Sequence, residues 1–506
     1  MNFETALERV RSLVADFKEH EAHYLSAKYQ EQDVRKDFID KFWIALGWDV
    51  NHDTQKNPNE QEVKVERNVG IEGRVKRADY AFLTPNFRDV RFFVEAKKPA
   101  RNIDNPDDYF QTIRYGWNAQ TPVSVLTDFE HFRVLDCRLK PDIKTARDRA
   151  LPKFNFHYTE YADAEKFAEI YYLFSREAAH AGALEKFAAA LPKPSGRAVN
   201  RRLFGEAFKT VDEDFLQQLD ELREELARSF KNRNEELNGE ELTEATQRTL
   251  DRLVFMRFLE DKLIEPEVIV ERLGNGGSAW GDFVAQSARL NAIYNGIIFK
   301  PHFIDAADFV VDERVFASVR ERLAHTNTVY NFNYIPIHVL GSIYERFLGK
   351  VIVATGKRAH VEEKPEVRKA GGVYYTPEYI VRYIVAETVG KLIDGKKPAE
   401  IAEMRFADIA CGSGSFLLGV FDELLRYHTA YYNRNKTGRA EGRRAGCVEN
   451  ADGTLRLSLR QKKAILTDNI YGVDLDAQAV EVAQLSLFLR LLEDETTASA
   501  KGYQLE

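Results

Sequence analysis

Apolar residues recur at two different spacings in the front of the chain. In residues 32–46, the apolar positions that share one helical face are Val34, Phe38, Ile39, Phe42 and Leu46. Five strand-like runs follow, namely EVKVERNV, RADYAFL, RFFVEAK, VSVLTD and FRVLDC, with a helical run, DDYFQTIRYGWNA, between the third and the fourth. This order predicts a small α/β domain with a mixed sheet over residues 1–165.

The pattern changes twice more along the chain. Residues 166–345 carry apolar positions every three or four residues, which predicts a helical connector, and residues 191–200 (LPKPSGRAVN) are a linker candidate. Strand-like and helical runs alternate again over 346–506, and the composition of the basic, Gly-containing stretch 433–458 indicates a mobile surface loop. The chain is therefore predicted to be a multidomain α/β protein.

Composition narrows the class of protein only slightly. The 506 residues suffice for two to four domains, and 44% of them are hydrophobic, as in ordinary globular proteins. Three widely separated cysteines without a Cys-x-x-Cys pair favour a reducing cytoplasm, and no apolar run approaches the ~20 residues that a bilayer requires. The net charge of −8 does not exclude a nucleic-acid partner, because basic residues cluster between Arg67 and Arg101.

The run RFFVEAKKPA places charges at the end of a strand. Glu95 and Lys97 project from the same side of the sheet, and fifteen residues separate Asp79 from Glu95, a spacing that a hairpin can close. Two neighbouring carboxylates resist joint ionisation unless a cation lies between them, and Mg²⁺ is the natural occupant. The alternative is a structural ion pair.

This order of residues resembles the PD-(D/E)xK nuclease superfamily, over roughly residues 20–140. The resemblance implies that Asp79 and Glu95 hold Mg²⁺, that Lys97 orients the attacking water, and that Gln111, in QTIRY, faces the site. It also places Glu31 where many members carry another acidic residue. Ala78 stands where the family has a proline.

A second group of motifs lies in the rear of the chain. The pattern of RFADIACGSGSFLLGVFDELL (405–425) predicts a strand, a Gly-rich turn and a helix, and Gly412 and Gly414 allow close approach of the backbone to a ligand. About sixty residues later, NIYGVDLDAQAVEVAQLSLFL places Asp474 at the end of another strand, where a carboxylate can accept ribose hydroxyls.

These motifs closely resemble the amino-methyltransferases that act on DNA, although Ile409 replaces the family's proline. The upstream stretch GGVYYTPEYIVRYIV (371–385) resembles the same family's first cofactor motif. The resemblance implies a partial Rossmann-like domain over 346–506 that binds S-adenosylmethionine. The implied cofactor-binding residues are Thr376 for the methionine carboxylate, Asp408 for the ammonium group, Ala410, Gly412 and Gly414 in the Gly-rich turn, Asp474 for the ribose and Leu475 for the adenine.

The family's catalytic tetrapeptide, Asn/Asp/Ser-Pro-Pro-Tyr/Phe, does not occur in these 506 residues. The chain therefore resembles an N-terminal portion of a Type IIG restriction–modification enzyme, from which methyl transfer is not expected. ATP is not expected either, because the phosphate-loop lookalike GKLIDGKK lacks the final Ser/Thr.

The implied function is Mg²⁺-dependent cleavage of double-stranded DNA, coupled to binding of S-adenosylmethionine for adenine-N6 or cytosine-N4 methylation. The need for two cuts favours a transient dimer on DNA. The alternatives are a modification-only or regulatory protein with an inactive nuclease domain, a larger ATP-dependent restriction enzyme, and an interaction scaffold.

Overall fold

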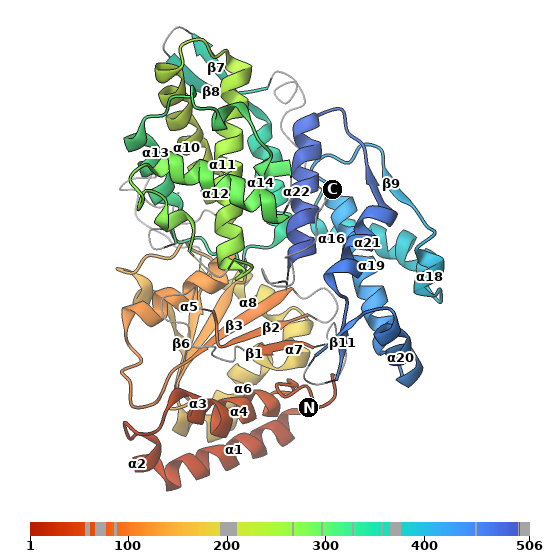
Figure 1. The fold of residues 1–506 in the computed structure, drawn as a ribbon. Helices are drawn as coiled ribbons and strands as arrows, with labels where there is room; N and C mark the ends of the chain where they lie inside the picture. The colour runs from red at the N-terminus through yellow and green to blue at the C-terminus, as the bar shows by residue number, and fades with distance from the viewer. Residues whose placement is uncertain are drawn as a thin grey trace. The chain divides into compact units, whose positions relative to one another are not determined.

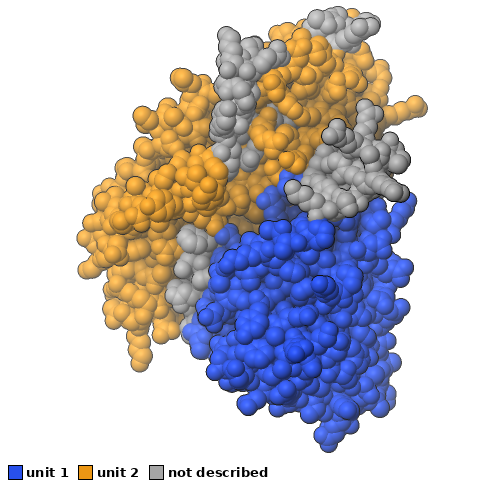
Figure 2. Space-filling model, turned by 180° about the vertical axis from the view of Figure 1, so that it is seen from behind, with its two compact units in different colours: residues 1–211 blue, residues 212–506 orange. Residues whose placement is uncertain are grey.

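The computed structural model divides into two compact units, Met1–Val211 and Asp212–Glu506 (Figure 2). It describes residues 1–55, 61–65, 77–84, 89–192, 210–265, 268–294, 297–325, 328–355, 358–364, 376–450, 453–493 and 495. Within these residues, no helix combines the length and the apolar composition that crossing a bilayer requires.

A mixed sheet forms the centre of the first unit. Its strands, which lie side by side in chain order, are β1 (Val63–Val65), β2 (Tyr80–Leu83), β3 (Val90–Ala96), β4 (Val123–Thr127), β5 (His131–Asp136) and β6 (Ala150–His157). β3 and β4 are parallel, and the other neighbours are antiparallel. The mixed sheet predicted from the sequence is thus confirmed.

Helices cover both faces of this sheet (Figure 1). One face meets α1 (Phe3–Glu19), α4 (Asp40–Ala45) and α6 (Ala164–Phe174) in an aromatic core that includes Trp43 and Phe92. The other face meets α5 (Pro106–Asn118), whose Ile113 packs in a smaller cluster with Leu126 and Leu135. Shorter elements of this unit are α2 (Glu21–Tyr24), η2 (Ala146–Arg149) and η3 (Tyr158–Ala162).

The predicted helix at 32–46 is present but not uniform. It runs through α3 (Glu31–Val34), a π-helical turn η1 (Arg35–Ile39) and α4. A π-turn is wider than an α-turn, so it shifts which residues face the sheet, and such turns often occur at functional sites. Here the shift places Arg35 in a buried position, with 8% of its surface exposed.

The first compact unit continues past residue 165, where the sequence pattern places the end of the front domain. α6, α7 (Arg176–His180) and α8 (Ala183–Ala190) belong to it, because Phe167, Ile170 and Phe174 are buried in the same core as the sheet. Most of the predicted linker at 191–200 lies outside the described residues.

The front half of the second unit is helical, as its sequence pattern predicts. Its helices are α10 (Val211–Arg233), α11 (Gly239–Asp261), α12 (Ala279–Tyr294), α13 (Glu313–Leu323) and α14 (Ile337–Leu348), with short turns η4 (Val270–Arg272), η5 (Ile297–Phe299) and η6 (Phe303–Asp305). A hairpin of β7 (Lys350–Thr355) and β8 (Arg358–Glu363) follows.

The rear half of the second unit alternates helices and short strands. Its main elements are α16 (Glu378–Val385), β9 (Phe406–Asp408), α19 (Ser415–Asn433), α21 (Leu459–Asn469), β12 (Ile470–Gly472) and α22 (Ala477–Leu492), and α16 leads through η7 (Ala386–Gly390) and α17 (Lys391–Ile393) to α18 (Pro398–Ile401). β9 and β12 pair in parallel, with Gly472 opposite Asp408.

The stretch 433–458, predicted to be a mobile surface loop, is not a loop, and its mobility stays a prediction. This stretch forms α20 (Lys436–Arg444) and the strands β10 (Val448–Glu449) and β11 (Leu455–Arg456). Asn435 caps the helix by accepting a hydrogen bond from the Gly438 N–H, and the Asn433 side chain bonds both backbone groups of Leu455. These local hydrogen bonds order a stretch whose composition alone indicates a loop.

Candidate functional site

The hairpin of β2 and β3 brings Asp79, Glu95 and Lys97 together. Tyr80 pairs with Val94, so Asp79 comes directly before one strand where Glu95 nears the end of the other. The Ala96 N–H donates to Asp79 Oδ2 at 2.8 Å, and Lys97 Nζ donates to Glu95 Oε1 at 2.6 Å. Each of the three charged residues is less than 8% exposed. The proximity expected from the sequence is therefore present.

Two further residues from the sequence prediction reach this cluster. Gln111, on α5, donates from Nε2 to Glu95 Oε1 at 3.3 Å and also to the Tyr115 hydroxyl. Glu31, at the start of α3, lies with Oε2 at 3.9 Å from Lys97 Nζ. The charged cluster thus lies on the α5 face of the sheet, opposite the aromatic core.

Arg35 is a member of the cluster that the sequence analysis missed. Its Nη1 lies 2.8 Å from Asp79 Oδ1, and its Nε donates to the Tyr80 hydroxyl at 3.3 Å. Tyr80 in turn donates to Asp40 Oδ1 at 2.7 Å. In the sequence, Arg35 is a charged residue next to the apolar face of the predicted helix. Its side chain points inward because of the π-turn, which the sequence pattern does not show.

The charges of the cluster are not balanced by the residues around them. Burial, followed by the charge of Asp79, raises the pKa of Glu95 even though Lys97 opposes the shift. Burial also raises the pKa of Asp79 against the opposing effects of Arg35 and Lys97, and it raises the pKa of Glu31. Ionising all three carboxyl groups is therefore unfavourable in the protein alone.

One carboxylate oxygen of the cluster is left without a hydrogen-bond partner in the part of the chain that the structure describes. Glu95 Oε2 is buried and has no hydrogen-bond partner among the described residues. Asp79 uses one oxygen for Arg35 and the other for the Ala96 N–H, but each carboxylate oxygen has a second lone pair. Oxygen donors of this kind fit Mg²⁺, which needs one or two carboxylates and retains water.

A second group of predicted residues lies at the carboxyl ends of β9 and β12. Asp474 Oδ2 accepts a hydrogen bond from the Gly412 N–H at 2.8 Å, and Oδ1 accepts one from the Asp476 N–H at 2.9 Å. These two backbone bonds lower the pKa of Asp474. Asp408 Oδ1 accepts a bond from the Ala410 N–H at 3.1 Å. Asp474 is therefore hydrogen-bonded directly to the backbone of the Gly-rich turn.

Gly414 lets the turn pass into α19. It has φ +84° and is the N-cap residue of that helix, and a Cβ there would lie 2.8 Å from the Cβ of Ala483 on α22. Both the backbone angle and the close neighbour require a glycine at this position. Gly412, with φ +51°, is the second residue of the turn in the left-handed region.

Exposed apolar residues directly follow Asp408 and Asp474 in the chain. Leu475 is fully exposed and Ile409 is 83% exposed. Thr376 comes shortly before α16, which packs against α19, whereas residues 371–375 of the upstream motif lie outside the described residues. An apolar surface beside carboxylates suits a ligand with both an aromatic ring and polar groups.

Comparison with known proteins finds similarity to restriction–modification proteins. Residues 395–504 match the family described as MmeI, DNA-methyltransferase domain. The type II restriction enzyme and methyltransferase RM.Eco57I of Escherichia coli is 31% identical over 501 residues, which are 97% of this chain and 47% of that protein. The putative type II restriction enzyme and methyltransferase RM.MjaORFECS2P of Methanocaldococcus jannaschii is 24% identical over 316 residues, 48% of this chain and 24% of the relative.

These matches confirm the resemblance to restriction–modification proteins that the motifs predict. The chain spans less than half the length of both relatives. Among solved structures, a DrdV–DNA complex matches with a TM-score of 0.33 and 13% identity over 98% of this chain and 39% of the other. The type IIG restriction endonuclease BpuSI matches with a TM-score of 0.26 and 11% identity over 88% and 39%. The resemblance to restriction–modification proteins rests on the sequence relatives.

Proposed function

We propose that this chain carries the nuclease and the cofactor-binding part of a Type IIG restriction–modification enzyme. The first unit would cleave double-stranded DNA with Mg²⁺, and the second would bind S-adenosylmethionine for adenine-N6 or cytosine-N4 methylation. The observation that supports the nuclease is the buried cluster of Asp79, Glu95 and Lys97, with its excess of negative charge and the unpartnered Glu95 Oε2.

Each residue of the cluster has a role that follows from its contacts. Asp79 and Glu95 would hold Mg²⁺, which would supply Lewis-acid chemistry for hydrolysis of a phosphodiester. Burial alone lowers the pKa of Lys97, but Glu95, Asp79 and Glu31 outweigh burial and raise it, so the amine stays protonated. A protonated Lys97 can orient the attacking water and stabilise the transition state. Gln111 holds Glu95 through its amide.

The rear unit supports the cofactor half of the proposal. Asp474 keeps free lone pairs for the ribose hydroxyls after its two backbone bonds, and Leu475 offers an exposed apolar side chain for adenine. Asp408 and the backbone of Ala410, Gly412 and Gly414 would meet the amino-acid part of the cofactor, with Thr376 before α16 taking its carboxylate.

Nicking of supercoiled plasmid by the metal-loaded chain tests the nuclease assignment. Asp79→Ala, Glu95→Ala and Lys97→Ala should abolish nicking and leave the affinity for S-adenosylmethionine unchanged. Asp37→Asn is the matched control, because Asp37 lies on the same leading helical segment but bonds Tyr29 instead of the cluster. Wild-type nicking by all three cluster variants would refute the assignment.

A second function, a modification or regulatory protein with an inactive nuclease domain, is favoured by one contact. Arg35 Nη1 lies 2.8 Å from Asp79 Oδ1 and neutralises its charge without a metal, as in a purely structural ion pair. Under this alternative the wild-type chain would not nick DNA at any Mg²⁺ concentration. The same plasmid assay therefore separates the two functions. Cleavage of both strands would in addition favour a transient dimer on DNA. Such a dimer would make the rate of double-strand cleavage depend on protein concentration.

A further inference from the structure

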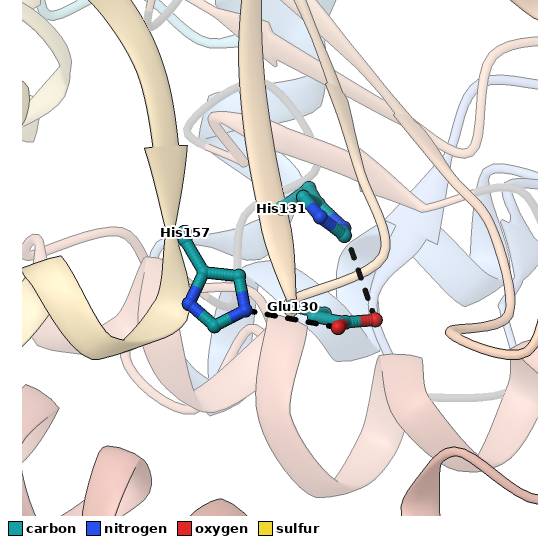
Figure 3. Close-up of side chains that lie close together, drawn as sticks. All are labelled: Glu130, His131 and His157. Carbon is teal, nitrogen blue, oxygen red and sulfur yellow. Dashed lines mark ion pairs between the residues drawn. The ribbon is translucent and has the colours of Figure 1, made fainter. Parts of the chain in front are cut away.

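A group of three potential metal ligands lies in the first unit, away from the proposed nuclease residues. Glu130, in the turn between β4 and β5, lies with His131 of β5 and His157 of β6 (Figure 3). One ligand atom from each residue lies within 4.8 Å of the other two. His131 and His157 are a cross-strand pair, so the sheet itself sets their spacing.

The Glu130 carboxylate lies between the two imidazoles. Its Oε1 is 3.7 Å from His157 Nε2, and its Oε2 is 3.8 Å from His131 Nδ1. Two ligands that each lie about 2.0 Å from a tetrahedral ion are about 3.3 Å apart. The two Glu130 distances exceed that value by about 0.4–0.5 Å, and all three ligand atoms lie within 4.8 Å of one another, so the groups are close to a metal-binding arrangement.

The surrounding residues hold these side chains in place. His157 Nδ1 lies 2.9 Å from the Thr159 hydroxyl, so a proton on Nδ1 would leave the Nε2 lone pair directed towards Glu130. Asp128, which is fully buried, accepts the His131 backbone N–H at 2.6 Å and lies 3.4 Å from His131 Nδ1, the same nitrogen that faces Glu130. A partner on the ring nitrogen that faces away from the ion, as Thr159 is for His157, fixes the orientation of a metal-bound imidazole.

The turn that carries Glu130 is itself rigid. The Thr127 hydroxyl donates to the His131 carbonyl at 2.7 Å, and the Tyr161 hydroxyl donates to the Phe129 carbonyl at 2.9 Å. Phe129 is a buried residue with φ +68°, a conformation that costs free energy outside glycine and persists only where its surroundings enforce it. A rigid turn keeps the ligands assembled before a metal binds.

We propose that Glu130, His131 and His157 bind a divalent transition metal of the zinc class, with water in the remaining position. Two imidazoles and one carboxylate suit Zn²⁺ or Co²⁺ and are a poor set for Mg²⁺, which prefers oxygen. The ion would fasten the β4–β5 turn to β6. The Lys97 N–H donates to the Thr127 carbonyl at 2.8 Å, so the fastened turn adjoins the strand end that carries Glu95.

Titration with Co²⁺, followed by its visible absorption, tests the proposal without any activity assay. The parent protein is a tag-free full chain that carries Asp79→Asn and Glu95→Gln, so that the nuclease cluster contributes no site. We expect one equivalent of Co²⁺ to bind with the intense absorption of a four-coordinate ion, to be displaced by Zn²⁺, and to resist excess Mg²⁺.

Single changes in this parent locate the site. His157→Gln should weaken Co²⁺ binding by more than about tenfold, and Glu130→Gln serves as a second variant should the first not fold. His360→Gln is the matched control, because His360 forms an exposed pair with Glu362 at 2.8 Å outside the three-residue group. The proposal is overturned if the parent shows no such absorption, if both ligand variants bind like the parent, or if His360→Gln weakens binding equally.

Discussion

Replacing Glu95 by glutamine should stabilise the metal-free protein. Burial and the nearby charge of Asp79 raise the pKa of Glu95 from 4.5 to about 8. The folded chain therefore binds more protons than the unfolded chain between pH 4.5 and about 8, so the free energy of unfolding falls as pH rises through this range. Glutamine keeps a carbonyl acceptor for Lys97 but cannot ionise, so the free energy of unfolding of the variant does not fall with pH for this reason.

The size of the effect follows from the same shift. At about 1.4 kcal/mol per pH unit, raising the pKa from 4.5 to about 8 corresponds to about 5 kcal/mol at pH 8. The difference in unfolding free energy between the variant and the wild type should be about 1 kcal/mol at pH 5 and should grow steadily up to pH 8. For a unit of this size, about 5 kcal/mol corresponds to roughly 10–20 °C in Tm.

Urea unfolding followed by tryptophan fluorescence measures this gap. Three of the four tryptophans, Trp43, Trp48 and Trp117, are buried in the first unit, so the signal reports mainly on that unit. The buffers contain EDTA at pH 5 and pH 8, and a parallel series contains Mg²⁺, which should stabilise the wild type and close the gap. Glu169→Gln, on the exposed side of α6, is the control and should change stability by less than about 0.5 kcal/mol.

Two outcomes would refute this reasoning. A Glu95→Gln variant no more stable than the wild type at pH 8 in EDTA would mean that the carboxylate is already balanced. A stability difference between the variant and the wild type that is the same at pH 5 and pH 8 would mean that the substitution acts through packing instead of charge. In either case the negative cluster would not require a cation, and the main support for the nuclease would be lost.

Three further changes test other contacts of the two sites. Arg35→Met leaves the buried Asp79 without its partner, so in EDTA it should destabilise the first unit by about 3–5 kcal/mol in urea unfolding, and Mg²⁺ should restore most of that loss. Gly116→Val should destabilise the first unit by about 1–3 kcal/mol and reduce nicking. A Cβ at this position would lie 2.6 Å from Cys137 Sγ and push α5 away from the sheet, so a variant as stable as the wild type would contradict this packing. Asp474→Ala should weaken calorimetrically measured binding of S-adenosylmethionine at least about tenfold, since the Gly412 N–H loses its acceptor, and an unchanged Kd would argue against the cofactor site.

The sequence predicted those parts of the site that strand geometry determines. Side chains on a strand alternate, so the run RFFVEAK by itself places Glu95 and Lys97 on one face, and a short hairpin leaves Asp79 few other positions. The same reasoning predicted the Gly-rich turn before α19, because a strand, two glycines and an apolar helix have one common arrangement.

Other features depend on contacts that the local pattern does not contain. Arg35 faces the cluster only because a π-turn changes the phase of its helix. His131 and His157 meet because they are directly opposite in the pairing of β5 with β6, and no spacing rule in the sequence specifies that register. The packing of α6 on the sheet likewise depends on a tertiary partner, since an amphipathic helix shows which face is buried but not what covers it.

The two faces of β3 explain how the first unit tolerates an unbalanced charged cluster. Glu95 and Lys97 occupy one face, whereas on the other Phe92 stacks on Phe82 with ring centroids 4.4 Å apart and meets Phe174 edge-on at 5.1 Å. Each such aromatic contact contributes about 0.5–1.5 kcal/mol beyond the burial of its area. The aromatic core therefore fixes the strand independently of the charges, so neutral substitutions at Glu95 should leave the backbone in place. A loss of nicking in those variants would then report on the chemistry of the cluster and not on its folding.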